Sequence, residues 1–228
     1  MRAFVRFLVF LLVLAVLVGG VAWFWAGRSA GPTITIRQPG KFVGQNSSLE
    51  LMAEAPEGKF TAIDVTVEQS GKSFPVFTLD QPQGDIRQES AERLYVMRPV
   101  GKRALPDLQS GPARIVIKAS RPVLFGLRNV SSTTTHDVTV RLEPPQVGVL
   151  STFHYINHGG SEFVVYRATP ADVESGVRVG NIEYAGFPAS AVGITSDPAL
   201  RVAFFALLFD QDLNTDFNVF ARDPAGNE

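Results

Sequence analysis

The chain has 228 residues, enough for one large domain or two small ones, and 45% hydrophobic with 19% charged residues is the composition of a folded protein. The absence of cysteine excludes disulfides and thiolate chemistry, and three histidines limit histidine chemistry. The first 28 residues hold three arginines and no acidic residue, so the rest of the chain has 18 basic and 22 acidic residues. That balance argues against a nucleic acid as partner, because nucleic-acid binding needs a strongly basic face.

The N-terminus predicts a membrane-spanning helix. Arg2 and Arg6 precede residues 7–27, a run of 21 residues without a charge. As a helix this run is about 31 Å long, close to the hydrocarbon thickness of a bilayer. Trp23 and Trp25 stand at its far end, where interfacial aromatic residues are common. We therefore expect residues 1–28 to be a signal-anchor, with the lipid bilayer as a partner through residues 7–27 and the N-terminus in the cytoplasm.

The alternative is a signal peptide that is cleaved. Its apolar region would be about 7–15 residues long and would end in small residues at the cleavage site. Here the run is longer, and the best small pair, Gly20 and Ala22, directly precedes Trp-Phe-Trp. A retained anchor is therefore favoured, and both alternatives place the rest of the chain outside the cytoplasm.

Residues 31–143 predict a first domain of antiparallel strands. Short segments of alternating apolar and polar residues are typical of strands that are buried on one face, and turn-rich segments separate them. These segments are residues 33–36, 49–54, 63–68, 113–120 and 138–142. Their number and spacing predict an immunoglobulin-like sandwich. The residues expected to face its core are Ile63, Val65, Val67, Ile115 and Ile117.

A second series of strands follows Glu143-Pro144-Pro145, where two prolines interrupt any ladder and stiffen the connection. The predicted strands are residues 147–150, 162–168, 176–179, 202–209 and 218–221. Together they predict a second immunoglobulin-like domain over residues 145–228. The eight apolar residues 202–209 are interpreted as a strand buried on both faces. The predicted fold class is thus all-β, with two tandem antiparallel sandwiches after one transmembrane helix.

The C-terminal end predicts an incomplete second sandwich. Asp223-Pro224-Ala225-Gly226-Asn227 has the chemistry of a hairpin turn, and a hairpin needs a returning strand. Residues 145–228 also fall short of the roughly 100 residues of an immunoglobulin-like domain. We therefore expect the last strand or strands of this domain to be missing from these 228 residues. The alternative is a chain that ends in a loop.

One candidate metal site is the histidine pair His154 and His158, with Glu162 four residues later. On a helix two histidines at this spacing share a face and can bind zinc. The surrounding segment ends in Gly-Gly and favours a strand, on which the two rings would be about 13 Å apart. We therefore expect no zinc here.

A second candidate is the acidic segment 210–216, which has oxygen-bearing side chains at alternate positions, as a calcium loop does: Asp210, Asp212, Asn214 and Asp216. The calcium-loop pattern then requires a glycine and a glutamate, where this chain has Thr215 and Ala221. These four residues are weak metal candidates, and the favoured alternative is an acidic loop between two strands.

Two stretches carry a resemblance to a known family: Pro-Pro-Gln-Val-Gly-Val-Leu-Ser-Thr-Phe-His-Tyr-Ile-Asn-His-Gly-Gly-Ser-Glu-Phe-Val-Val-Tyr-Arg at 144–167, and Val-Phe-Ala-Arg-Asp-Pro-Ala-Gly-Asn-Glu at 219–228. They resemble the non-catalytic region that precedes the catalytic domain in bacterial lysostaphin-like (LytM-type) zinc metallopeptidases. The resemblance implies a single-pass protein of the inner membrane whose C-terminal region is periplasmic. It also implies a zinc catalytic domain, beyond residue 228, that cleaves peptidoglycan.

The zinc ligands of that family form a His-x-x-x-Asp and a His-x-His motif, and this chain has neither. We therefore expect no catalytic residue, metal ligand or cofactor in residues 1–228, with zinc in the missing catalytic domain. The implied function is the membrane anchor and spacer or regulatory region of an exported peptidoglycan endopeptidase, with peptidoglycan or envelope proteins as further partners. The alternative is a stand-alone binding or structural module of the envelope.

Overall fold

The computed structural model describes residues 2–56, 59–80, 85–90, 92–193 and 196–228. They divide into two compact units. The first unit comprises residues 1–41, 48–108 and 112–139, and the second comprises residues 42–47, 109–111 and 140–228.

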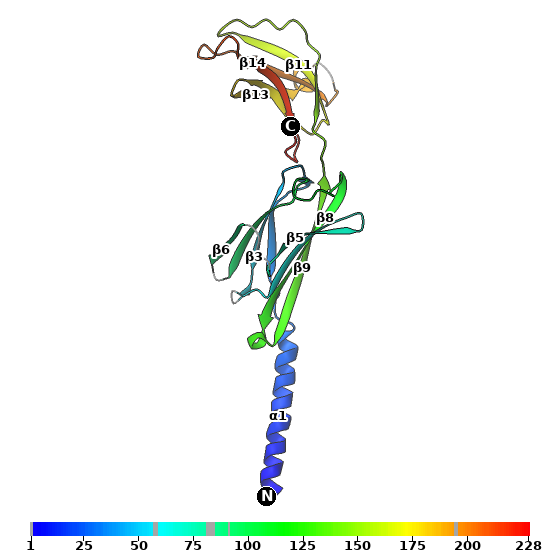
Figure 1. The fold of residues 1–228 in the computed structure, drawn as a ribbon, viewed down its shortest axis with the longest axis vertical. Helices are drawn as coiled ribbons and strands as arrows, with labels where there is room; N and C mark the ends of the chain where they lie inside the picture. Colours follow the sequence, from blue (N-terminus) through cyan, green and yellow to red (C-terminus); the bar gives the residue numbers. More distant parts are fainter. Residues whose placement is uncertain (1, 57–58, 81–84, 91, 194–195) are drawn as a thin grey trace. The chain divides into compact units, whose positions relative to one another are not determined.

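The N-terminal element is one uninterrupted helix, α1 (Arg2–Ala26) (Figure 1). Within Phe4–Ala26, a window of 18 residues has a mean hydropathy of 2.8, and none of that window is buried against protein. Among the described residues, α1 is the one helix that is long and apolar enough to cross a membrane, and an N-terminal signal sequence would have the same features. The helix ends at Ala26, and the amide of the following Gly27 donates to the carbonyl of Trp23 at 3.2 Å.

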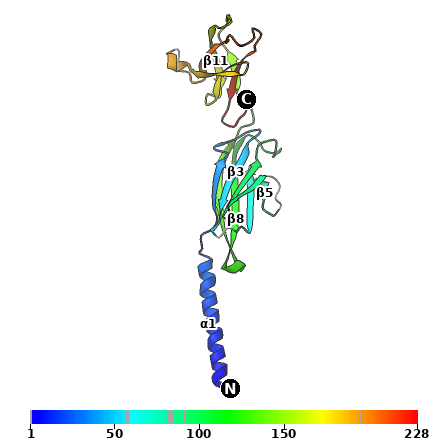
Figure 2. The same cartoon turned by 90° about the vertical axis from the view of Figure 1, so that its left-hand side faces the viewer.

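Two antiparallel sheets form the sandwich of the first unit (Figures 1 and 2). One sheet has the order β1 (Thr33–Gln38), β3 (Ser48–Glu54), β7 (Arg93–Pro99), β6 (Asp85–Ser90). The other has the order β2 (Phe42–Val43), β9 (Arg128–Val140), β8 (Gly111–Val123), β4 (Ala62–Gln69), β5 (Lys72–Thr78), and its edge strand β2 falls among the residues assigned to the second unit. These orders match the A-B-E-D and G-F-C arrangement of the immunoglobulin fold, extended by a strand at each edge of the second sheet. The predicted all-β, immunoglobulin-like class is confirmed.

The core of this sandwich follows the alternation seen in the sequence. In the register of β4 with β8, Val65 lies opposite Ile117 and Val67 lies opposite Ile115. All five residues predicted to face inward are at most 3% exposed: Ile63, Val65, Val67, Ile115 and Ile117. This part of the prediction is confirmed, because a period of two places successive side chains on opposite faces.

The second unit contains a single continuous ladder of six antiparallel strands. Its order is β10 (Gln146–Val149), β11 (Ser161–Thr169), β14 (Leu200–Ala206), β13 (Ile182–Pro188), β12 (Glu174–Val179), β15 (Phe217–Arg222). Strand β13 pairs with β12 through residues 182–185 and with β14 through residues 186–188, so it passes from one layer to the other. In immunoglobulin terms, the described residues supply A-B-E-D and C-F, and no described strand occupies the G position beside β15.

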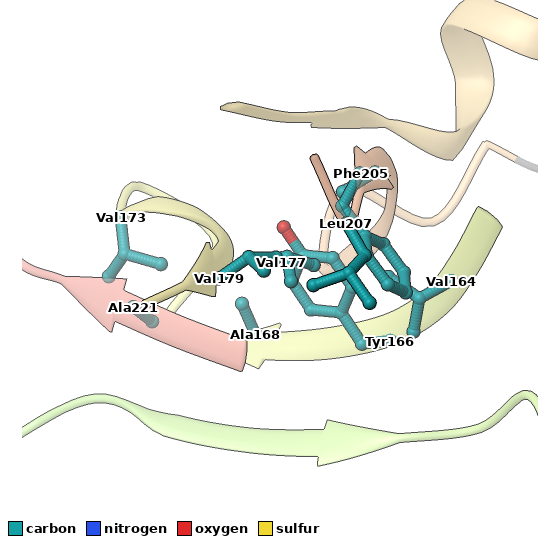
Figure 3. Packing of buried hydrophobic residues seen from close by; sticks show 10 residues of the cluster. Val164, Tyr166, Ala168, Val173, Val177, Val179, Phe205, Leu207 and Ala221 are labelled. Atoms are coloured by element: carbon teal, nitrogen blue, oxygen red, sulfur yellow. The ribbon is translucent and has the colours of Figure 1, made fainter. Parts of the chain in front are cut away.

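The core of the second unit is centred on Tyr166, whose side chain is fully buried between the strands (Figure 3). Its hydroxyl lies 2.9 Å from the hydroxyl of Ser175, which is also buried. Burial raises the pKa of Tyr166, and the hydrogen bond with Ser175 opposes part of that shift. Tyr166 therefore fills the core while its polar end remains hydrogen-bonded.

The interpretation of residues 202–209 as a strand buried on both faces is wrong. Strand β14 ends at Ala206, and Phe204 on its outer face is 65% exposed. The Phe204 ring contacts Phe163 of β11 at a centroid distance of 4.8 Å, so each shields part of the other although none of the described strands covers that face. Phe209 lies beyond the strand and is 80% exposed.

Substitution of Ile115 by alanine should lower the free energy of unfolding of the first unit by about 2–5 kcal/mol, because it leaves a cavity in the core. The matched control is Lys118→Ala on the exposed face of the same strand, which should change stability by no more than about 0.5 kcal/mol. Chemical denaturation of both variants measures the difference. Equal stabilities would contradict the packing described above.

Tyr166→Phe should destabilise the second unit by about 1–3 kcal/mol, because it leaves the buried Ser175 hydroxyl without its partner. Adding Ser175→Ala should recover much of that loss, since both polar groups are then removed together. Thermal unfolding of the two single variants and the double variant measures this coupling. A double variant whose loss equals the sum of the single losses would refute the pairing.

Candidate functional site

In the structure, the two candidate zinc histidines contact different residues of the chain. Nε2 of His154 lies 3.0 Å from the hydroxyl of Ser151. Nε2 of His158 lies 3.0 Å from the carbonyl oxygen of Gln211, and its ring packs against Phe209 at 5.1 Å. The carboxylate of Glu162 accepts a hydrogen bond from the backbone amide of Phe163. These contacts direct the three side chains to different neighbours, not to a shared ligand position.

The acidic segment 210–216 forms a loop between β14 and β15. Oδ1 of Asp212 accepts hydrogen bonds from the amide and the side chain of Asn214, at 2.7 and 3.1 Å. The backbone carbonyl of Asp216 accepts from the amide of Gly180 at 3.1 Å. Asp212 and Asn214 thus stabilise the turn of their own loop. Within the described ranges, no three His, Asp or Glu side chains come close enough together to hold a metal ion, Asp210 and Asp216 included.

The strongest candidate site is an apolar cavity of about 350 Å³ in the second unit. Three members of the hydrophobic core, Val164, Val177 and Phe205, reach its wall, so the core opens to the outside at this place. The remaining lining residues come from β15, from the end of β10 and from the segment between β10 and β11: Phe217, Asn218, Val219, Val149, His154 and Ile156. Sequence reasoning did not identify this cavity, because its lining residues are spread over five strands and a connecting segment.

The cavity lies beside an exposed strand edge. Within the part of the chain that the structure describes, β15 pairs with β12 through residues 217–222, and no strand is paired on its other side. The backbone amides and carbonyls of such an edge are available to another strand. An apolar cavity next to a free edge is the arrangement that an added β-strand fills.

The segment after β15 is a closely hydrogen-bonded turn. The amide of Asp223 donates to the carbonyl of Asn227 at 3.0 Å, and Oδ1 of Asp223 accepts from the amides of Ala225 and Asn227 at 2.9 and 2.8 Å. Gly226 has a φ of +82°, which glycine adopts without strain. The side chain of Asn227 donates to Oδ2 of Asp223 and to the carbonyl of Arg141, both at 2.9 Å. The turn therefore reverses the chain and holds it in place.

Glu228 lies beside β15 after this reversal. Its carboxylate pairs with Arg222 of β15 at 2.8 Å and with Arg178 of β12 at 2.7 Å. Both guanidinium groups also lie over the ring of Phe220, at 5.7 and 5.1 Å. Hydrogen bonds from Arg222 and then from Arg178 lower the pKa of Glu228. These ion pairs hold the Glu228 side chain beside residues of β15 and β12.

No protein-family model matches the chain, and no curated protein matches it. Among solved structures, the chain is similar to the D1–D4 ectodomain fragment of ICAM-5, with 10% sequence identity and a TM-score of 0.29. The match covers 83% of this chain and 52% of that fragment, so the chain spans about half the length of the fragment. At this TM-score and identity the likeness carries no conclusion on function, and the assignment of the fold rests on the strand order.

Glu228→Gln should lower the free energy of unfolding of the second unit at neutral pH by no more than about 1 kcal/mol, because the ion pairs are partly exposed and screened by solvent. Since folding lowers the pKa of Glu228, its contribution is present above the ordinary value of 4.5 and is lost as the pH falls through the folded pKa. Thermal unfolding at neutral and acidic pH measures this. A difference between protein and variant that persists at acidic pH would contradict the electrostatic origin.

Proposed function

We propose that the chain is a non-catalytic β module that α1 anchors in a membrane. The observation that carries this proposal is the exposed apolar surface of α1. Large side chains along the whole helix, from Phe4 to Trp25, are exposed. Apolar surface of this extent requires an apolar environment, and a helix of this length fits the hydrocarbon core of a bilayer.

The flanking charges support one orientation of this anchor. Arg2 and Arg6 precede the apolar run and favour a cytoplasmic N-terminus, so both β units lie outside the cytoplasm. In a bacterium this is a single-pass protein of the inner membrane with a periplasmic C-terminal region. The resemblance to the lysostaphin-like endopeptidases supports this placement.

The role that we propose for the β units is that of a spacer and docking region for a zinc endopeptidase domain beyond residue 228. The free edge of β15 supports this role. A strand that continues from Glu228 would run along β15 and cover the apolar cavity lined by Phe217 and Val219. The second unit would then gain its G strand and pass directly into the next domain.

The second candidate function is a stand-alone binding module of the envelope. The same cavity favours it, because about 350 Å³ of apolar space beside His154 and Asn218 could accept a ligand group without any added strand. Binding of purified peptidoglycan fragments by residues 31–228, lost on Phe217→Asp, would favour this function over the spacer.

The anchor is tested with a phosphatase fused after Ala30 and with alkaline extraction of membranes from cells that express the whole chain. We expect an active phosphatase and a protein that stays in the membrane fraction with its N-terminal residues intact. An inactive fusion would refute the orientation. A soluble protein that starts near Trp23 would refute the anchor.

The role of the β15 edge is tested by extending the chain with the next residues encoded after codon 228, about 5–10 residues for one strand. We expect the extension to raise the unfolding temperature of the second unit and to reduce self-association, because it covers an exposed edge and an open core. Alternating apolar residues in the extension should be replaced by Asp in a control. A stop codon after residue 228, or an extension without effect, would refute this role.

A further inference from the structure

The tip of the β8–β9 hairpin is apolar, exposed and conformationally strained. Phe125 is fully exposed, and Leu127 is 71% exposed. Leu124 and Phe125 have φ values of +53° and +57°, a backbone conformation that costs roughly 1–2 kcal/mol for each residue with a side chain. Phe125 and Leu127 do not pack in the core of the sandwich. Exposed apolar side chains on a strained turn are candidates for an interaction with a partner outside the sandwich.

The hairpin is fixed next to the segment that leaves α1. Residues 27–32 connect α1 to β1, and two of their carbonyls are held by the hairpin strands. Nε of Arg121 in β8 donates to the carbonyl of Ala30 at 2.7 Å, and the Arg121 side chain is buried. The hydroxyl of Ser132 in β9 donates to the carbonyl of Pro32. These bonds place the connector alongside the hairpin stem.

The hairpin also contacts the last turns of α1 directly. Nη1 of Arg128 donates to the carbonyl of Trp23 at 2.6 Å, and its guanidinium carbon lies 5.2 Å from the centre of the Trp23 ring. Gly27 allows this approach, since a Cβ at that position would lie 2.3 Å from the same guanidinium carbon. Figures 1 and 2 both show the β8–β9 loop beside the C-terminal end of α1.

We propose that the hairpin tip, residues 124–127, inserts into the lipid interface beside α1 as a second membrane contact. Past the bond between Arg121 and Ala30, the tip extends by roughly 10 Å, at the strand rise of about 3.3 Å per residue. This places Phe125 and Leu127 at the depth of Trp23 and Trp25, where an aromatic belt meets the headgroups. The proposal rests on the membrane anchor proposed above.

The residues around the tip fit that environment. Aromatic and leucine side chains partition into the boundary between headgroups and acyl chains, and arginine side chains reach from there to phosphate. Arg28 and Arg128 flank the tip on the helix and hairpin sides, and the Arg28 guanidinium lies 4.1 Å from the Phe24 ring. A second contact beside α1 further restricts the orientation of the first unit on the membrane.

The test uses the absence of native cysteine, which allows one label per protein. The whole chain with Leu127→Cys carries an environment-sensitive NBD fluorophore and is reconstituted in vesicles of phosphatidylethanolamine and phosphatidylglycerol. Quenching by a nitroxide on the lipid acyl chain is then measured. The control label is Ser73→Cys, which is exposed and follows the β4–β5 turn at the opposite end of the sheet.

We expect a blue-shifted emission and several-fold stronger quenching at position 127 than at position 73. Phe125→Asp in the Leu127→Cys background should abolish this difference, because it removes the neighbouring apolar group that inserts. Equal, water-like signals at the two positions in protein retained after alkaline extraction of the vesicles would refute the hairpin contact alone. Release of the protein by that extraction would refute the anchor, and the hairpin contact with it.

Discussion

The pairing of β4 with β8 is the constraint on which the first unit depends. Each strand places its apolar residues on one face, and the register sets Val65 against Ile117 within a closed core. A shift by one residue would turn Ile63 and Ile115 to solvent, so the buried faces of β4 and β8 specify this register. The position of Arg121 relative to the connector, and with it the approach of Arg128 to α1, follows from the same register.

The second unit forms its hydrophobic core with fewer strands than the first. A buried tyrosine hydrogen-bonded to Ser175 occupies its centre, and β13 serves both layers instead of one. The result is a core that opens beside β15 through the apolar cavity. The turn at Asp223–Asn227 is closely hydrogen-bonded, so its own contacts position the chain directly after β15.

Alternation in the sequence predicted the strands whose two faces differ most. Strands β4 and β8 were found in this way because apolar and charged residues alternate along them. Strand β6 (Asp85–Ser90) and the first half of β9 were missed, because their residues are almost entirely polar and do not alternate with apolar ones. Residues 202–209 were wrongly predicted to be buried on both faces, because hydrophobicity alone does not distinguish a covered face from one on which the exposed Phe204 packs against the half-buried Phe163. The apolar cavity depends on which strands are neighbours, and local sequence carries little information on that.

The connector between α1 and β1 has a mechanical consequence. Residues 27–32 contain two hydrogen-bonded carbonyls and no long flexible stretch, so a pull on the first unit reaches α1 with almost no slack. The load enters at β1, whose ladder with β3 runs from Thr33 opposite Glu54 to Gln38 opposite Glu50. Tension along β1 loads those hydrogen bonds in shear, all at once, and not one after another as in unzipping. If α1 is the membrane anchor proposed above, this connector would transmit displacement of the first unit directly to the membrane.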